Sequence, residues 1–203
     1  MSAIAGDLLA EIRGLAPLEV LAVATAIGYL LLAIRENIWC WLCAAISTSC
    51  YVWLFVGARL YMESALNGFY LAMAGYGFWM WRYGAGRERD LPVTSWPAAV
   101  HFAAVVAIVA LSVASGALLE RYSDAARPYV DSATTWAAVW TTFLVARKVL
   151  ENWWYWLVID AVSVWLYWDR ELPLTALLFV AYLGMIPFGL VAWRRSYREA
   201  RAA

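Results

Sequence analysis

The stretch Glu151–Trp156, ENWWYW, repeats an earlier stretch of the chain, Glu36–Trp41, ENIWCW, at an offset of 115 residues. A second match joins Tyr70, Gly77, Trp81 and Arg82 to Tyr182, Gly189, Trp193 and Arg194, at an offset that is three positions shorter. A difference of three positions between the connecting loops would reconcile the two offsets. The sequence therefore predicts two copies of one structural unit.

Apolar runs long enough to cross a bilayer surround both copies. The chain has 203 residues, of which 65% are hydrophobic, well above the content of soluble domains. The breaks between the runs are short and charged, so no soluble domain fits between them. The seven runs are Pro17–Ile34, Ile38–Gly57, Met62–Trp81, Pro97–Leu119, Tyr129–Ala146, Trp153–Trp168 and Leu172–Trp193.

The repeat fixes how these runs are grouped. Runs one to three correspond to runs five to seven, and run four has no counterpart. Because corresponding runs are four apart, the two copies cross the membrane in the same direction. We therefore expect an all-α membrane protein, one transmembrane domain over residues 1–203, with three-helix bundles at 17–81 and 129–193 and a linker helix at 97–119. Parallel repeats of this kind are typical of transporters.

The charges predict the orientation and exclude some partners. The formal net charge is zero, which gives no electrostatic reason to bind nucleic acid. One side of a seven-span chain holds five basic residues and the other side ten, including the cluster after Trp193. Because basic residues favour the cytoplasmic side, the C-terminus should be cytoplasmic and the N-terminus outside.

Catalytic and metal-binding motifs are absent from the sequence. There is no Gly-x-Ser-x-Gly, no His-Glu-x-x-His and no Gly-x-x-x-x-Gly-Lys phosphate loop, and there is one histidine. Cys40, Cys43 and Cys50 lie in one apolar run without further ligands, so they are interpreted as packing residues. We expect no enzyme activity, no cofactor and no metal.

A candidate binding stripe lies in the sixth run. Read as a helix, Trp153, Trp156 and Asp160 fall at i, i+3 and i+7, on one face. Two flat aromatic rings and one anion suit a flat, cationic solute, because a carboxylate in a membrane span needs a partner. Two alternatives stay open: the tryptophans belong to an interfacial aromatic belt, or Asp160 is protonated and bonded to a hydroxyl of another span.

Polar side chains in other runs extend the candidate site. Asn67 and Tyr70 share a stripe in the third run, and Tyr182 is the repeat counterpart of Tyr70. Hydroxyl groups that a sugar or an aminopyrimidine could bind come from Thr134, Thr142 and Tyr51. The alternative for the threonines is that each hydroxyl bonds to its own helix backbone.

Several motifs together resemble the PnuC-type vitamin transporters. They are the start Arg147-Lys148-x-x-Glu151-Asn152-Trp153, the pair Trp153-x-x-Trp156, the Leu166-Tyr167 end and the aromatic-glycine-aromatic end Tyr76–Trp81. The resemblance spans about Pro17 to Arg195. It implies a fold like that of full-length SWEET sugar transporters, with two three-helix bundles joined by an added span.

The resemblance also implies a function. These proteins take up a vitamin across the bacterial inner membrane by facilitated diffusion, and a cytoplasmic kinase traps it. Nicotinamide riboside is the first expected substrate, and relatives carry thiamine or riboflavin. In the family, the Trp pair that matches Trp153 and Trp156 binds the vitamin. Where an asparagine is common, this chain has Asp160, and a glutamine of the third span appears as Asn67.

The expected partners are therefore a small vitamin and the lipid bilayer. The sequence leaves open which vitamin is carried, whether an ion is coupled and whether the protein is a homo-oligomer. A reading from another class is a membrane enzyme or a subunit of a larger complex that does not transport.

Overall fold

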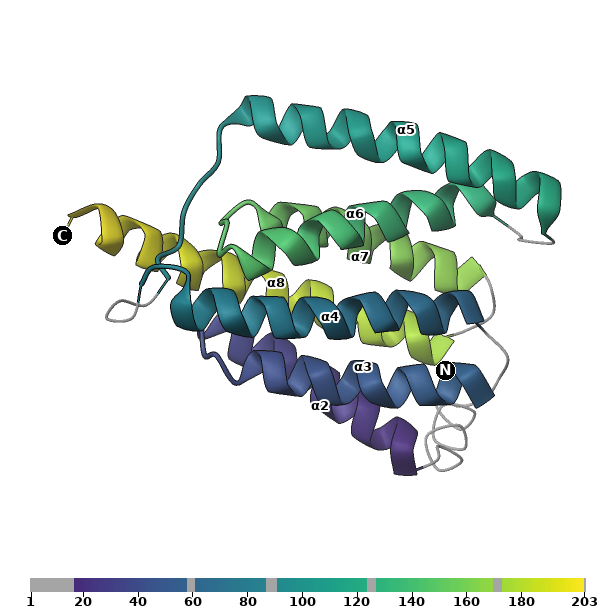
Figure 1. Ribbon diagram of the computed structural model, residues 1–203, viewed down its shortest axis with the longest axis horizontal. Helices are drawn as coiled ribbons and strands as arrows, with labels where there is room; N and C mark the ends of the chain where they lie inside the picture. Colours follow the sequence, from purple (N-terminus) through teal and green to yellow (C-terminus); the bar gives the residue numbers. More distant parts are fainter. Residues whose placement is uncertain (1–16, 58–60, 87–90, 124–126, 170–172, 203) are drawn as a thin grey trace.

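The computed structural model describes residues 17–57, 61–86, 91–123, 127–169 and 173–202, and within them the chain forms seven α-helices (Figure 1). The predicted all-α architecture, with two three-helix repeats joined by one extra helix, is confirmed. The helices are α2 (Pro17–Ile34), α3 (Cys40–Gly57), α4 (Tyr61–Tyr83), α5 (Ala98–Tyr122), α6 (Pro128–Ala146), α7 (Asn152–Asp169) and α8 (Pro173–Ala202).

Each expected span coincides with one helix, and the largest difference is at the end of the chain. Helix α8 continues past Trp193 to Ala202. Its last turns contain no proline or glycine, and Arg195 donates to Glu199 at 2.8 Å, an i,i+4 pair that supports the helix. The charged extension therefore belongs to the helix although it is too polar for a membrane core.

The outer faces of the helices are suited to lipid. By length and hydropathy alone, α2, α5 and residues Ala176–Ala202 of α8 are long and apolar enough to cross a membrane. Helix α7 is less hydropathic, yet its exposed side chains are large and apolar, including Trp154, Val158 and Trp165. Exposed apolar surface of this kind is normal where lipid replaces water.

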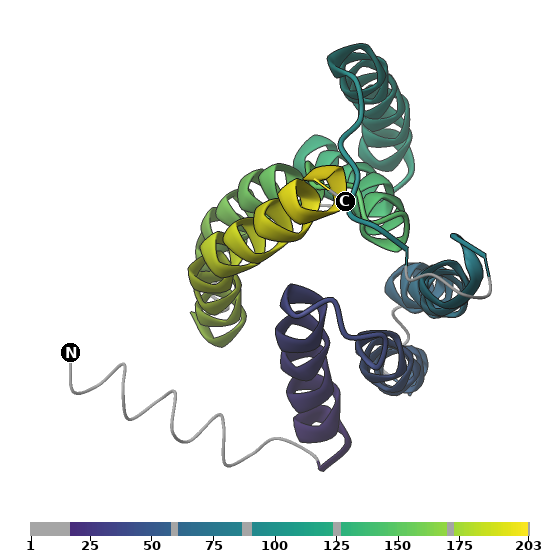
Figure 2. The ribbon, with the colours of Figure 1, turned by 90° about the vertical axis from the view of Figure 1, so that its left-hand side faces the viewer.

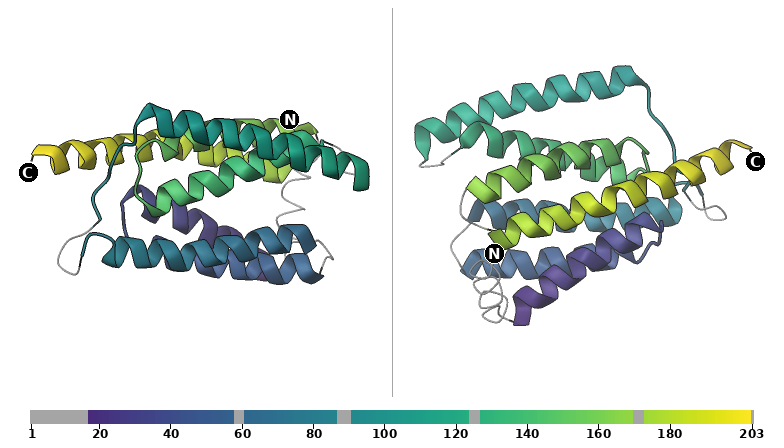
Figure 3. Two further views of the ribbon diagram at one scale, coloured as in Figure 1. Left: turned by 45° about the horizontal axis from the view of Figure 1, so that its top comes forward. Right: turned by 180° about the vertical axis from the view of Figure 1, so that it is seen from behind.

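Six helices form a closed ring, and α5 lies outside it. Neighbours along each repeat pack together, and the ring closes through α2 against α8 and α4 against α6. Figure 3 shows α2 and α8 side by side in its right-hand view. Helix α5 packs on α6 alone among the described helices and stands apart from the first bundle in the end-on view (Figure 2).

The two repeats share one register, which corrects the alignment expected from sequence. The spacing that separates Tyr70 from Tyr182 recurs at the helix boundaries. It separates the helix ends at 34 and 146 and at 57 and 169, and also the helix starts at 40 and 152. We call this spacing the repeat offset. Pairing Glu36–Trp41 with Glu151–Trp156 is therefore wrong by three positions, and the connecting loops do not differ in length. The error arose because tryptophan recurs at close intervals in both stretches.

Four tryptophans mark the internal two-fold relation. Trp81 donates from Nε1 to the carbonyl oxygen of Val145 at 3.1 Å. In the equivalent bond, Trp193 donates to the carbonyl oxygen of Ala33 at 2.9 Å. The rings of Trp41 and Trp81 meet edge to face at 5.5 Å, as do those of Trp153 and Trp193 at 5.5 Å. Both hydrogen bonds cross from one repeat to the other.

An ion pair joins the repeats at the same end of the ring. Lys148 Nζ lies 2.9 Å from Glu36 Oε2 and 4.6 Å from the centre of the Trp81 ring. Lys148 and Glu36 occupy equivalent turns, and both have positive φ angles, 50° and 53°. Non-glycine residues rarely adopt this conformation, and such strain often accompanies switching segments. We call Glu36, Lys148 and Trp81 the inter-repeat latch.

Candidate functional site

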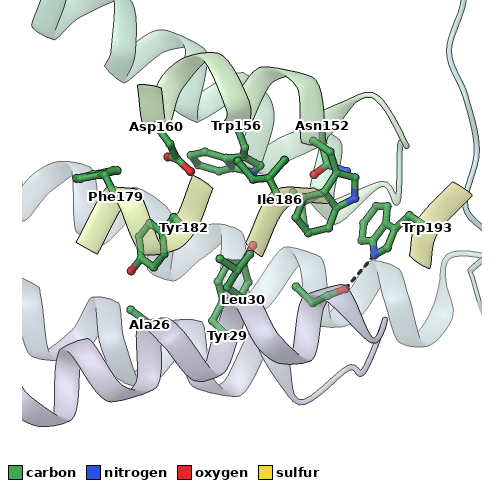
Figure 4. A pocket seen from close by; sticks show the side chains of 13 residues that line it. Ala26, Tyr29, Leu30, Asn152, Trp156, Asp160, Phe179, Tyr182, Ile186 and Trp193 are labelled. Carbon is green, nitrogen blue, oxygen red and sulfur yellow. Dashed lines mark hydrogen bonds between the residues drawn. The ribbon is translucent and has the colours of Figure 1, made fainter. Parts of the chain in front are cut away.

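A cavity of about 140 Å³ lies between the repeats, on the side of the ring formed by α2, α7 and α8. Figure 4 shows its side chains converging from these helices. The lining residues are Ala26, Tyr29, Leu30 and Ala33 of α2, Val145 of α6, Asn152, Trp153, Trp156 and Asp160 of α7, and Phe179, Tyr182, Ile186 and Trp193 of α8.

The cavity is closed towards the latch end by tryptophan packing. Trp193 is fixed by its hydrogen bond to Ala33, drawn as a dashed line in Figure 4. The Trp153 ring stands perpendicular to it, at an interplanar angle of 90°. These contacts belong to the repeated framework, so the same packing that recurs in both repeats forms the wall at this end.

Asp160 is the acidic residue of the lining. Its side chain is 4% exposed, and no ion pair among the described residues includes it. It lies one helical turn from Trp156 on α7 and within electrostatic reach of the Tyr182 phenol of α8. Figure 4 places the Asp160 carboxyl beside Trp156 and above Tyr182. A carboxyl group in such an apolar setting needs a counter-ion to remain charged.

Trp153 has a packing role that sequence reasoning did not anticipate. The benzene edge of its ring lies on Gly189, where an added Cβ would overlap the ring. The equivalent Trp41 lies on Gly77 in the same way. Trp156 and Asp160, in contrast, align with Ala44 and Thr48 at the repeat offset. These two residues therefore distinguish the α7 side of the ring from the α3 side.

Of the nine residues expected from sequence to form the site, four line the cavity: Trp153, Trp156, Asp160 and Tyr182. Tyr51 lies within electrostatic reach of Tyr182, and Tyr70 within reach of Tyr29, so both are near the lining without forming it. Asn67, Tyr70 and Thr142 align with Phe179, Tyr182 and Leu30 at the repeat offset, which places them at the equivalent positions of the other half.

The two threonines are engaged by their own helix. Thr134 donates to the carbonyl oxygen of Val130 at 3.1 Å and to that of Asp131 at 3.0 Å. Thr142 donates to the carbonyl oxygen of Ala138 at 2.8 Å. Neither threonine lines the cavity. Because each hydroxyl group already donates its hydrogen, its oxygen could only accept a hydrogen bond from a ligand.

Sequence reasoning missed several lining residues, most of which have apolar or aromatic side chains. Tyr29 and Leu30 come from α2, and Phe179 stacks on Tyr167 at 5.3 Å. Nothing distinguishes such residues from ordinary packing residues of a membrane helix. Asn152 could have been found, because an amide at the start of an apolar helix carries polar atoms that require partners.

The lining can bind a flat organic ligand. Its described residues offer aromatic faces, the Asp160 carboxyl group, the Asn152 amide and the phenols of Tyr29 and Tyr182, and they include no Lys, Arg or His. Across the described residues, no group of three His, Cys, Asp or Glu side chains is placed to hold a metal. The groups that the lining presents are suited to stacking and to interactions with charge.

The chain is similar to proteins that carry small molecules across membranes. Residues 16–195 match the family model described as nicotinamide mononucleotide transporter. The riboflavin/roseoflavin transporter RibM of Streptomyces davaonensis is 25% identical over 187 residues, which cover 88% of this chain and 86% of RibM. A crystal structure of the vitamin B3 transporter PnuC superposes with a TM-score of 0.70 at 23% identity, covering 88% of this chain and 81% of that chain. This likeness shows a common fold.

Proposed function

Because this chain belongs to the nicotinamide mononucleotide transporter family, we propose that it carries nicotinamide riboside across the bacterial inner membrane by facilitated diffusion. The resemblance to the PnuC-type vitamin transporters is confirmed by the family match. The chain is thus a multi-pass membrane transporter of a vitamin-type small molecule and not an enzyme. Our proposal adds the identity of the vitamin, nicotinamide riboside, to this general function.

The observation that carries this proposal is the buried Asp160 carboxylate beside the Trp156 ring. Nicotinamide riboside has a flat pyridinium ring with a fixed positive charge. Stacking of the ring on Trp156 would gain a cation–π contribution of about 0.5–2 kcal/mol, and Asp160 would neutralise the charge. The ligand in turn supplies the counter-ion that Asp160 lacks among the described residues.

The same lining favours the nucleoside over its phosphate ester. A phosphate requires basic side chains or free backbone amides, and the lining residues that the structure describes include no Lys, Arg or His. A phosphate near Asp160 would also face a like charge in a region of low screening. We therefore propose the riboside as substrate, although the family description names the mononucleotide.

Uptake by purified protein in liposomes tests the proposal. Labelled nicotinamide riboside should enter until its concentrations inside and outside are equal, and enclosing a riboside kinase should raise total uptake. A tenfold excess of unlabelled thiamine or riboflavin should leave the rate unchanged. Uptake that is blocked by thiamine or riboflavin would reassign the vitamin. Accumulation driven by a sodium or proton gradient would reject facilitated diffusion.

Thiamine is the second candidate, because its thiazolium ring is also a fixed cation that Asp160 could neutralise. Riboflavin is neutral, so the carboxylate gives no reason to prefer it, although RibM carries riboflavin or roseoflavin. The competition experiment separates all three vitamins in one assay.

We expect Asp160→Asn to weaken binding of the cationic vitamin. Asparagine has nearly the same shape, so the substitution removes charge and little else. Loss of a hydrogen bond or contact with a charged group corresponds to about 1.5–3 kcal/mol. Isothermal titration of the variant against wild type measures the loss. An unchanged affinity would mean that Asp160 has a structural role only.

Trp156→Ala should weaken vitamin binding by about 1–3 kcal/mol, on the scale of base–aromatic stacking. The matched control is Trp154→Ala, on the same helix, whose side chain is 54% exposed on the outer face. This control should bind as wild type does. Equal losses in both variants would indicate membrane anchoring in place of stacking.

We propose that the latch end of the ring faces the cytoplasm, with the C-terminus inside and the N-terminus outside. Arg35, Arg82, Arg147 and Arg194 each directly follow an apolar run of the sequence at this end, in keeping with the preference of basic residues for the cytoplasm. A C-terminal alkaline phosphatase fusion, which is active outside the cytoplasm, should be inactive. An active fusion would reverse the orientation.

We further propose that the two bundles and α5 work as one transport domain. In alternating access, two similar halves rock about a central site so that one end opens as the other closes. The two cross-repeat tryptophan bonds and the latch hold one end closed in the conformation described. Release on that side would require the latch to separate.

A further inference from the structure

Asn152 has a polar atom that the fold leaves without a partner. The side chain is 0% exposed and lies on the cavity wall. Its Nδ2 donates to the carbonyl oxygen of Val149 at 2.7 Å, and this bond fixes which side of the amide carries the oxygen. Oδ1 is buried and makes no hydrogen bond to any described residue. A buried acceptor of this kind costs stability unless something donates to it.

Comparison of the two repeats indicates that the amide oxygen of Asn152 does not serve the repeated framework. The equivalent position in the first repeat, at the repeat offset, is Cys40, which is equally buried at the start of α3. The ring nitrogen of Trp153 also has no partner among the described residues, but that of Trp41 has none either, so this feature belongs to the repeated packing. The orphaned oxygen of Asn152 occurs in one repeat, the one that supplies the α7 wall.

Asn152 is placed to contact a ligand ring that stacks on Trp156, at the end of the ring away from Asp160. Asn152, Trp156 and Asp160 follow one another at i, i+4 and i+8 along α7, on one side of the helix. Eight residues rise about 12 Å. A hydrogen bond to Asn152 takes about 3 Å of this and an ionic contact with Asp160 about 4 Å. The remaining length is about that of one six-membered ring with a substituent. Figure 4 shows Trp156 between the other two side chains.

We propose that Asn152 Oδ1 accepts a hydrogen bond from an N–H group of the substrate, on the side of the ring away from its positive charge. This inference rests on the proposed function and deepens it. The chemical class is a flat heterocyclic cation that carries a primary amide or amino group. Asn152 thereby selects substrates with this donor, while Asp160 selects the charge and Trp156 the ring.

The test compares two ligands that differ at the donor. Nicotinamide riboside carries a carboxamide NH₂, and 3-acetylpyridine riboside has a methyl group in its place with the same ring, charge and sugar. Titration of wild-type protein in detergent should show that the acetyl compound binds about tenfold more weakly, because it leaves Oδ1 unpaired. In Asn152→Cys, which installs the residue of the other repeat, the two ligands should bind with a ratio near one.

Asp160→Asn is the matched control. This substitution should weaken the binding of both ligands equally, because it removes the charge that pairs with the cation they share. The tenfold ratio of their affinities should therefore be unchanged. Equal binding of the two ligands to wild type, or an unchanged ratio in Asn152→Cys, would overturn the assignment of Asn152. If wild type binds neither riboside, the proposed substrate is wrong. Thiamine and its deamino analogue, which has a hydrogen atom in place of the pyrimidine amino group, then decide on Asn152 by the same ratio.

Discussion

Cross-linking position 36 to position 148 should stop transport, and reduction of the cross-link should restore it. The variant is Glu36→Cys/Lys148→Cys in a protein whose three native cysteines are replaced by alanine, treated with a short bis-thiosulfonate reagent. The two side chains bridge the repeats at 2.9 Å, so a bridge between them holds this end closed. Because alternating access opens each end in turn, uptake into liposomes should fall to that of protein-free vesicles.

A cross-link within one repeat provides the control. Glu36 and Arg82 border the same surface hollow at the latch end, and both belong to the first repeat. Bridging Glu36→Cys to Arg82→Cys should leave transport unchanged, because the repeats remain free to separate. The yield of each cross-link is measured by mass spectrometry. Normal transport by fully cross-linked Glu36→Cys/Lys148→Cys protein would show that the repeats do not part at this end.

The architecture was predictable from sequence because the apolar runs that indicate its helices are long. Seven apolar runs separated by short charged breaks determine the helices, and each run became one helix. The repeat was also detectable, but its register was not secure in the tryptophan-rich stretch. Gly77 and Gly189 gave the true offset, since Gly77 lies under the Trp41 ring and Gly189 under the Trp153 ring, and such a contact is demanding. The pattern ENxWxW instead paired Trp41 with Trp156, although Trp153 is the tryptophan that makes the equivalent contact with a glycine.

The correct register would have changed the site prediction. At the repeat offset, Trp153 pairs with Trp41, and both lie on a glycine of another helix. Positions that repeat in this way serve the framework. Trp156, Asp160 and Asn152 differ from their counterparts Ala44, Thr48 and Cys40, and all three line the cavity. Breaks in the internal symmetry are therefore a sequence signal for the site.

Other parts of the site could not be read from sequence for a physical reason. The cavity lies on one side of the ring, where α2 meets α7 and α8, and this depends on how the side chains of both halves pack. A periodic stripe gives the face of a helix but not the neighbour that covers it. Tyr70 and Thr142 illustrate the limit, because they occupy equivalent positions to lining residues without lining the described cavity.

Gly189→Ala should destabilise the protein strongly, in contrast to the same change nearby on α8. A Cβ at residue 189 would overlap Cη2 of the Trp153 ring, and the ring cannot retreat because it packs edge to face against Trp193. Overpacking of a buried contact costs about 1–3 kcal/mol, and the displaced ring would also deform the cavity wall. We expect a lower Tm in detergent and weaker vitamin binding.

Gly184→Ala is the matched control, because a Cβ at residue 184 has no neighbour within 4 Å. Alanine favours the helix by about 1 kcal/mol over glycine, so this variant should keep or raise the Tm. The repeat supplies an independent pair: Gly77→Ala, under the Trp41 ring, should lower the Tm, and Gly75→Ala should not. Adding Trp153→Phe to Gly189→Ala should recover part of the lost stability, since the smaller ring leaves room for the new methyl group. If Gly189→Ala and Gly184→Ala unfold at the same temperature, the close packing of glycine and tryptophan does not hold the repeats in shape.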